Sequence, residues 1–336
     1  MKTVTLAHGS GGQAMQQLIA RLFMRAFDNP WLATQEDQAR LPLDVLTKSG
    51  DHLAFSTDSY VIDPLFFPGG DIGKLAVCGT ANDVSVSGAV PRWISCGFIL
   101  EEGLAYDTLE QVVTSMAQTA RDAGIAVVTG DTKVVPRGAA DKLFINTAGI
   151  GAVPCHLNWG ANQVAPGDII LVSGTLGDHG ATILNLRESL GLDGELRSDC
   201  AVLTPLIQSV TGLEGIKAMR DATRGGVNAV LHEYAAVSAC GMEINEASLP
   251  LHPAVRGVCE LLGLDALNFA NEGKLVMVVA RDKAEGVLAQ LRAHPLGAEA
   301  AIIGEVVERK GVRVTGLYGV KRTLDLPHAE PLPRIC

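Results

Sequence analysis

Four aspartates of this 336-residue chain share one kind of context, the end of an apolar run or the edge of a glycine-rich turn: Asp58, Asp83, Asp131 and Asp221. Acids placed in this way can converge at one end of a sheet. Clustered carboxylates suit Mg²⁺, which takes hard oxygen ligands and bridges to phosphates. One such aspartate is usually a helix cap or a turn former. For four such aspartates, a magnesium–nucleotide site is at least as good an interpretation as four separate caps or turns. Asp63 is an alternative to Asp58 as a member of this site.

Two cations and one further acid accompany these aspartates. Lys133 and Arg224 stand beside Asp131 and Asp221 and could neutralise developing phosphoryl charge, although each could equally form a surface ion pair. Glu272 lies between Asn271 and Gly273 at the mouth of an apolar run. Burial there would tune its pKa for work as a general base, whereas in the simpler interpretation it is an ordinary turn acid.

The last residue, Cys336, is the one cysteine of seven that lies outside an apolar run. No C-x-x-C pair occurs, so neither a zinc site nor a thioredoxin-type site is indicated. The preceding prolines, Pro327, Pro331 and Pro333, fix φ and remove backbone donors, which predicts an extended segment without a helix. A thiol on such an arm suggests a carrier of covalent cargo. A frayed terminus that happens to end in cysteine is the alternative interpretation.

Hydrophobic periodicity predicts an α/β protein in which short buried strands alternate with helices. The pattern breaks around residues 151–166, which divides the chain into an N-terminal domain (1–155), a C-terminal domain (156–320) and a flexible tail (321–336). Strands are expected at 53–58, 94–100, 125–128, 143–150, 169–172, 275–280, 302–307 and 312–315. Helices are expected at about 13–27, 72–84, 109–120 with Asp107 or Thr108 as N-cap, 226–237 and 283–291.

The composition excludes several classes of partner. Lysine and arginine number 27 against 37 acids, a net charge of −10, which argues against nucleic acid and against an anionic membrane surface. No apolar run is long enough to span a membrane, and no signal-type segment follows Met1, so we expect a cytoplasmic protein. A P-loop nucleotide site is also excluded, because Gly73-Lys74 lacks the upstream glycine and the following Ser or Thr of that motif.

Five motifs carry a family resemblance. Gly79-Thr-Ala-Asn-Asp83 and Asp221-Ala-Thr-Arg-Gly-Gly226 resemble the ATP-binding motifs of the aminoimidazole ribonucleotide synthetase (PurM-like) superfamily, which includes selenophosphate synthetase and thiamine monophosphate kinase. Within it, His8-Gly-Ser-Gly-Gly12, Thr129-Gly-Asp-Thr-Lys-Val-Val135 and the closing Pro333-Arg-Ile-Cys336 resemble the hydrogenase maturation family HypE, over essentially the whole length. The selenophosphate branch relies on a reactive residue and a lysine near the N-terminus. This chain has neither there, which argues against that activity.

The resemblance implies a fold of two α/β domains that forms a homodimer through the N-terminal sheet, with ATP and Mg²⁺ as cofactors. It implies that ATP is bound by five residues, Thr80, Asn82, Asp83, Thr132 and Arg224, and that Mg²⁺ is bound by the four aspartates named first. Lys133 would stabilise transferred phosphoryl charge and Glu272 would take a proton. The carbamoyltransferase HypF would place a carbamoyl group on Cys336, ATP-dependent dehydration would give a thiocyanate, and the cyano group would pass to iron in the HypC–HypD assembly for [NiFe] hydrogenase.

Two other functions remain open on the sequence. A small-molecule ATP enzyme of the ribonucleotide synthetase type would use the acids but not the tail. A thiol carrier or docking scaffold would use Cys336 without hydrolysing a nucleotide. The dehydratase hypothesis is favoured because it alone uses both the acids and the last thiol.

Overall fold

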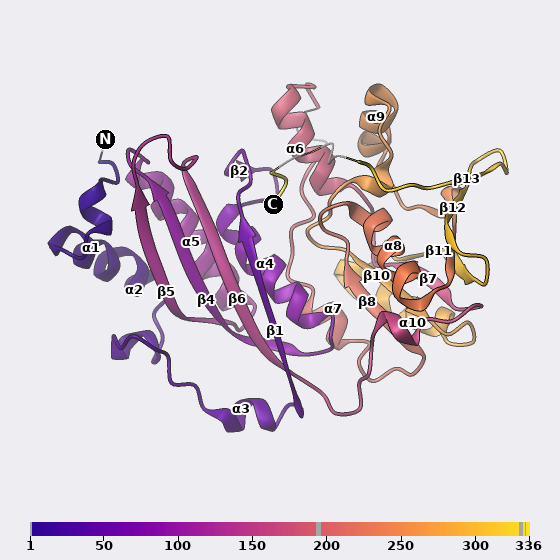
Figure 1. The fold of residues 1–336 in the computed structure, drawn as a ribbon, viewed down its shortest axis with the longest axis horizontal. Helices are drawn as coiled ribbons and strands as arrows, with labels where there is room; N and C mark the ends of the chain where they lie inside the picture. Colours follow the sequence, from indigo (N-terminus) through magenta and orange to yellow (C-terminus); the bar gives the residue numbers. More distant parts are fainter. Residues whose placement is uncertain (1, 193–195, 329–331, 333) are drawn as a thin grey trace.

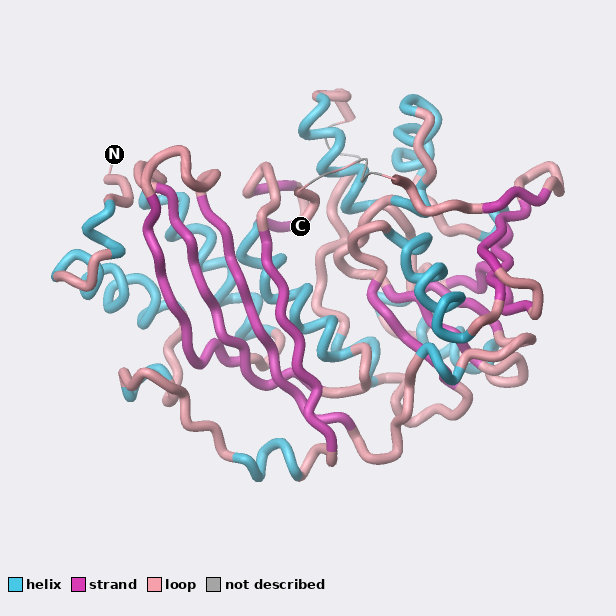
Figure 2. The backbone as a smooth tube through the Cα atoms, in the orientation of Figure 1, coloured by secondary structure: helices cyan, strands magenta, loops and turns pink. Residues whose placement is uncertain are grey.

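The computed structural model describes residues 2–192, 196–328, 332 and 334–336. Two sheets stand side by side, each with helices packed against it, and the end of the chain returns to the space between them (Figures 1 and 2). The first sheet belongs to the N-terminal half of the chain and the second to the C-terminal half. The chain therefore forms two α/β halves, each a sheet with its own helices, that pack against each other along one side.

The first sheet has the strand order β1-β6-β4-β5, and only the β4–β5 pair is parallel. Its strands are β1 (His52–Tyr60), β4 (Val90–Glu101), β5 (Ala126–Val135) and β6 (Leu143–Val153). Helices α4 (Ile72–Ser85) and α5 (Tyr106–Asp122) lie behind it in Figure 1. The other face carries exposed apolar side chains, among them Phe55 on β1 and Ile99 on β4, and no helix crosses it in that view.

The second sheet has the strand order β13-β12-β9-β11-β7-β10-β8. Its strands are β7 (Ile169–Val172), β8 (Ile216–Asp221), β9 (Gly241–Asn245), β10 (Leu275–Val279), β11 (Ala301–Val307), β12 (Gly311–Thr315) and β13 (Lys321–Thr323). The central strands β7 and β10 are buried along their whole length, which explains their unbroken apolar sequences. Helices of this half are α6 (Asp178–Glu188), α7 (Thr204–Gln208), α8 (Gly226–Ser238), α9 (Pro253–Leu262) and α10 (Ala284–Arg292).

Shorter elements complete the N-terminal half. They are α1 (Gln13–Leu18), a π-helical turn (Ile19–Phe23), α2 (Met24–Ala26), α3 (Leu43–Thr47) and the two-stranded hairpin β2 (Phe66–Phe67) and β3 (Gly70–Asp71). Asp71 ends that hairpin and caps α4, because its carboxylate accepts the amide hydrogens of Gly73 and Lys74. Nearly every residue of α4 is buried, so this helix forms the common wall between the two halves.

Polar contacts fasten α4 to the second half. The Asn82 amide donates to the carbonyl of Ala201 and accepts from the amide of Leu203, at 3.0 and 2.7 Å. One turn later, the hydroxyls of Ser85 and Thr204 lie 2.7 Å apart. Because these groups are buried, removing either partner of a hydrogen bond would leave the other unsatisfied and would destabilise the folded protein. The junction between the halves is thus fixed at the helix that carries Asp83.

Some expected elements differ from the structure. The strand expected at 125–128 continues through β5 to Val135, so Asp131 and Lys133 lie inside a strand and not at its end. Asp83 lies inside α4, because the helix continues past it to Ser85. The N-cap expected at Asp107 or Thr108 is wrong: α5 begins at Tyr106 after Ala105, so both residues lie in its first turn. Among the described residues, no helix is both long and apolar enough to cross a membrane.

Candidate active site

Asp58 and Asp83 meet at the junction of β1 and α4. The Ser56 hydroxyl donates to the Asp83 carboxylate at 2.6 Å, and Asp58 follows Ser56 by two residues, so it faces the same side of β1. That side is the α4 face, because Asp58 pairs in register with Thr147, whose hydroxyl donates to the Ala76 carbonyl in α4 at 3.0 Å. Strand alternation therefore places both carboxylates on the helix-covered face.

Asp221 and Glu272 are brought together by the β8–β10 pair. Asp221, the last residue of β8, lies opposite Leu275, the first residue of β10, and Glu272 precedes Leu275 by three residues. Asp199 supports this turn, since its carboxylate accepts the amide hydrogens of Glu272 and Gly273 at 3.0 and 3.2 Å. The Lys274 ammonium lies 3.2 Å from the same carboxylate. A side chain at Gly273 would collide with the Asp199 carbonyl, so the turn requires glycine.

These carboxyl groups perturb one another across the junction. Burial raises the pKa of Asp221 to about 7, and the charge of Asp83 adds to the effect. Burial also raises the pKa of Glu272 well above its usual range, helped by Asp199, Asp221 and Asp58. The pKa of Asp83 is raised by burial and by Asp58, although the Ser56 hydrogen bond opposes this. Acids that resist ionisation together will release protons when a cation arrives.

The residues present fit a magnesium ion that a nucleotide brings with it. Oδ2 of Asp221 and Oε1 of Glu272 are buried and accept no hydrogen bond from the described residues. In that part of the chain, no three His, Cys, Asp or Glu side chains are arranged to hold a metal alone. Mg²⁺ usually takes one or two carboxylates and completes its shell with water and phosphate oxygens. The cluster therefore suits a metal–phosphate pair better than a metal by itself.

Cys336 is docked against this cluster. Its side chain is 5% exposed, and the Arg224 guanidinium donates to Sγ at 2.9 Å. Burial raises the pKa of the Cys336 thiol to about 12; Glu272 acts in the same direction and Arg224 opposes it. In Figure 1 the end of the chain lies between the two halves, beside β2. Pro331 and Pro333, on which the expectation of an extended tail partly depends, lie outside the described residues.

Three residues expected to bind ATP are engaged within the protein. The buried Thr80 hydroxyl lies 2.6 Å from that of Thr147 and 3.1 Å from that of Tyr60. Both ends of the Asn82 amide hold the 201–203 segment, as described above. Thr132 is buried on the α5 side of β5, where it lines a mostly apolar cavity of about 140 Å³. The first two thus shape the wall behind Asp83, and the third lies away from it.

Asp131 and Lys133 do not join the cluster within one chain. Asp131 lies in register with Gly97, Asn146 and Ser59, the row of residues that faces away from α4. Its carboxylate forms an ion pair with Lys133 at 2.8 Å, and both side chains are more than half exposed. Of the four aspartates, the structure therefore gathers Asp58, Asp83 and Asp221, together with Glu272, Arg224 and Cys336.

Several residues of the site carry no recognisable signal in the sequence. Asp199 supports the Glu272 turn but belongs to an irregular segment with no periodic pattern. His179 and Arg187 on α6 bond to the carbonyls of Ile335 and Arg334, at 2.8 and 2.5 Å. Interaction with Cys78 and then burial raise the pKa of the Cys200 thiol. The one local signal near them is the glycine-rich Gly177-Asp-His-Gly180 turn at the start of α6, which specifies no partner.

Comparison with known proteins identifies the family. Models of the AIR synthase related proteins match twice, the N-terminal domain over residues 35–153 and the C-terminal domain over residues 165–316. The carbamoyl dehydratase HypE of Escherichia coli (strain K12) is 76% identical over 336 residues, which span all of both chains. This chain belongs to the HypE family. The family resemblance inferred from the sequence is thereby confirmed.

Solved structures of HypE proteins share the fold. A crystal structure of Escherichia coli HypE matches with a TM-score of 0.94 and 77% identity, covering 96% of this chain and 100% of that one. A HypE in complex with ATP matches with a TM-score of 0.94 and 48% identity over 99% and 100% of the two chains. A HypE–HypF complex matches at 0.80 with 46% identity, over 92% and 99%.

The raised pKa of Asp221 makes stability depend on pH. The folded chain keeps a proton that the unfolded chain has already lost, so this stabilising contribution is complete below about pH 4 and is lost as pH rises through about 7. Without nucleotide or metal, the Asp221→Asn variant should therefore gain stability over wild type as the pH rises. Its free energy of unfolding, relative to wild type, should be roughly 2 kcal/mol higher at about pH 8.5 than at about pH 5.5. Urea unfolding at both pH values measures this. Asp44→Asn, in an exposed pair with Lys48, is the control; an equal effect of Asp221→Asn at both pH values would refute the assignment.

Proposed function

We propose that this chain is an ATP-dependent carbamoyl dehydratase acting on its own Cys336. It converts an S-carboxamide on that sulfur into a thiocyanate. The observation that carries the proposal is the docking of the Cys336 thiol between Arg224 and the acid cluster, since a residue far away in sequence reaches the buried Glu272. Family membership and the HypE complex with ATP give independent support.

Cys336 serves as a carrier in this scheme. A thiol with a pKa of about 12 holds almost no thiolate at neutral pH, and the thiolate is the nucleophile. The docked thiol therefore cannot attack a carbamoyl donor efficiently. Loading requires the tail to leave the site, and dehydration requires it to return. The buried site then keeps water from the activated group, which hydrolysis would destroy.

Glu272 is the base of the reaction. An amide oxygen leaves poorly, and ATP supplies the phosphoryl group that makes it a good leaving group. Once the oxygen is phosphorylated, the nitrogen loses one proton to solvent; Glu272 accepts the second as the C–O bond breaks, inorganic phosphate leaves, and the sulfur carries a nitrile. Burial raises the pKa of Glu272, so its carboxylate would be a strong base once a cation beside it had favoured the ionised form. Arg224 holds the sulfur, and Asp58, Asp83 and Asp221 would hold Mg²⁺ with the phosphates.

The mass of the C-terminal peptide tests this function. After incubation with a carbamoyltransferase, carbamoyl phosphate and Mg-ATP, wild type should carry an adduct on Cys336 that loses one water only when ATP is hydrolysed. Glu272→Gln should load normally but lose water at least about 100-fold more slowly, because the nitrogen proton has no acceptor. Glu260→Gln on α9 is the matched control.

Other outcomes separate the competing functions. ATP consumption that persists in Cys336→Ala with a free substrate would indicate a small-molecule ATP enzyme. Loading of Cys336 without any ATP consumption would indicate a simple thiol carrier. Either result would overturn the dehydratase assignment.

The partners follow from the same chemistry. A carbamoyltransferase must supply the adduct, and HypF fills that role by analogy with the relative that forms a HypE–HypF complex. The cyano group passes on to iron, for which we propose the HypC–HypD assembly of [NiFe] hydrogenase maturation. We place these steps in the cytoplasm, because all seven cysteines are free thiols and Cys336 must remain one.

A homodimer through the open face of the first sheet would give Asp131 and Lys133 a role. That face exposes Leu53, Phe55 and Ile99 and is uncovered in Figure 1. With the two-fold axis along the strands, β5 of one chain lies over β1 of the other, the strand that carries Asp58. Lys133 then lies over β1 of the partner subunit, the edge strand next to that subunit's site, and from this edge it would reach the phosphoryl charge.

Mixed dimers distinguish this shared site from a self-contained one. Lys133→Ala and Glu272→Gln should each be inactive alone. Mixed after subunit exchange, they should recover about a quarter of wild-type dehydration, since half of the dimers are mixed and each has one complete site. Lys48→Ala mixed with Glu272→Gln should keep about half of wild-type dehydration and controls for activity lost on mixing, because the exposed Lys48 directly follows α3. No recovery despite proven exchange would exclude a shared site.

A further inference from the structure

The last three residues are held from both halves of the protein at once. Ile335 and Cys336 are almost fully buried and belong to the same apolar cluster as side chains of α4, α6 and α9. Apolar packing alone would favour burial without fixing a register. The hydrogen bonds and the ion pair made by residues 334–336 therefore determine where the Cys336 sulfur lies.

The second half contributes two contacts from α6. His179 donates from Nε2 to the Ile335 carbonyl at 2.8 Å, and its Nδ1 lies 2.8 Å from the Ser198 hydroxyl. Burial lowers the pKa of His179, so a neutral ring with the proton on Nε2 fits both contacts. Two turns later, Arg187 donates to the carbonyls of Arg334 and Asp63, at 2.5 and 2.7 Å. One guanidinium thus binds the tail and the first half together.

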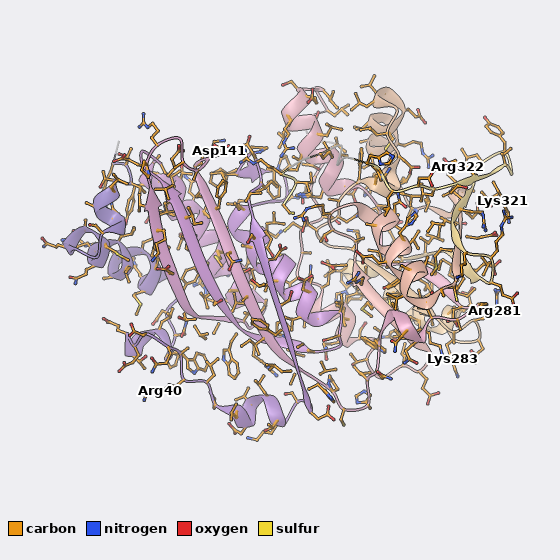
Figure 3. The ribbon with its side chains drawn as sticks, viewed as in Figure 1. Arg40, Asp141, Arg281, Lys283, Lys321 and Arg322 are labelled. Carbon is orange, nitrogen blue, oxygen red and sulfur yellow. The ribbon has the colours of Figure 1, made fainter. Side chains whose placement is uncertain are left out.

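The first half contributes Val61 and Asp141. The Val61 amide donates to a main-chain carboxylate oxygen of Cys336 at 2.9 Å, and the Val61 carbonyl accepts from Nε of Arg334 at 2.9 Å. Nη1 of Arg334 donates to the Asp141 carboxylate at 2.7 Å. Asp141, labelled in Figure 3, lies in the turn between β5 and β6. We call His179, Arg187, Val61 and Asp141 the tail clamp.

Electrostatics make the clamp easy to open. Arg334 and Arg187 are neighbouring cations, and burial together with Arg334 lowers the pKa of Arg187. The carboxylates of Asp141 and Asp63 offset this repulsion between the two arginines. Asp63 also forms an ion pair with Lys142 at 2.6 Å. The Arg334–Asp141 pair is about 40% exposed, so it is worth little more than a surface ion pair. Loss of one such contact shifts the balance between docked and released tail without affecting the core.

We propose that Arg187 and Asp141 are positioning residues that set the fraction of molecules in which Cys336 is docked. The proposal rests on the dehydratase function, and it deepens that function by separating two steps. Dehydration needs the docked tail, whereas loading and delivery need the released one. Weakening the clamp should therefore slow dehydration and speed loading. A merely structural defect would slow both.

Alkylation of the thiol measures the released fraction directly and requires no catalysis. Iodoacetamide should modify Cys336 slowly in wild type, while the exposed Cys155 provides an internal standard in the same molecule. Relative to Cys155, the Cys336 rate should rise roughly threefold in Asp141→Asn and roughly tenfold in Arg187→Lys, which keeps the charge but loses the planar fork. Matched controls are Asp44→Asn and Arg281→Lys, both in exposed pairs away from the tail.

Single-turnover rates complete the test. In the two clamp variants, loading by the carbamoyltransferase should rise with alkylation, and loss of water from the loaded tail should fall by a similar factor. Unchanged Cys336 alkylation in both variants would overturn the clamp. Faster alkylation with slower loading would overturn its gating role. If alkylation rises as expected but wild type never loses water from loaded Cys336, the clamp stands and the dehydratase function fails.

Discussion

Burial of the Glu272 carboxyl group is the constraint on which the rest of the site depends. The side chain is 2% exposed, one of its oxygens accepts no hydrogen bond from the described residues, and Asp58, Asp199 and Asp221 all raise its pKa. An isolated ionised carboxylate would be expensive in this position. The fold tolerates the group because the Asp199 carboxylate fixes the turn and Lys274 offsets part of the charge. A strong base is thereby held ready beside a buried sulfur.

The same burial explains why the sulfur must travel. A site dry enough to strengthen Glu272 also suppresses ionisation of Cys336, whose pKa rises to about 12. One thiol environment cannot serve both nucleophilic loading and dehydration. The structure resolves the conflict by binding the last three residues through a few backbone carbonyls and one partly exposed ion pair. Such contacts specify a position and still allow release, which a fully apolar anchor would not.

Much of this site could be predicted from the sequence, because it depends on local rules. Asp221 follows an apolar strand and Glu272 precedes one, so the pairing of β8 with β10 brings them together. Asp131 shows where such reasoning ends. Its glycine-rich context looked like a strand end, but β5 continues through it, and side-chain alternation points it to the open face. Asp199, His179 and Arg187 could not be predicted, since their partners are far away in sequence and no local pattern identifies them.

The protonation state of Glu272 tests the central claim most directly. Difference infrared spectra of wild type against Glu272→Gln, recorded without nucleotide or metal over a pH series, report the protonated carboxyl of this one residue. The structure predicts that its carbonyl stretch persists well above the ordinary titration range of glutamate and weakens when Mg-ATP is added, because the cation favours the ionised form. A carboxyl that is already ionised at about pH 5, near the ordinary range for glutamate, would contradict the account.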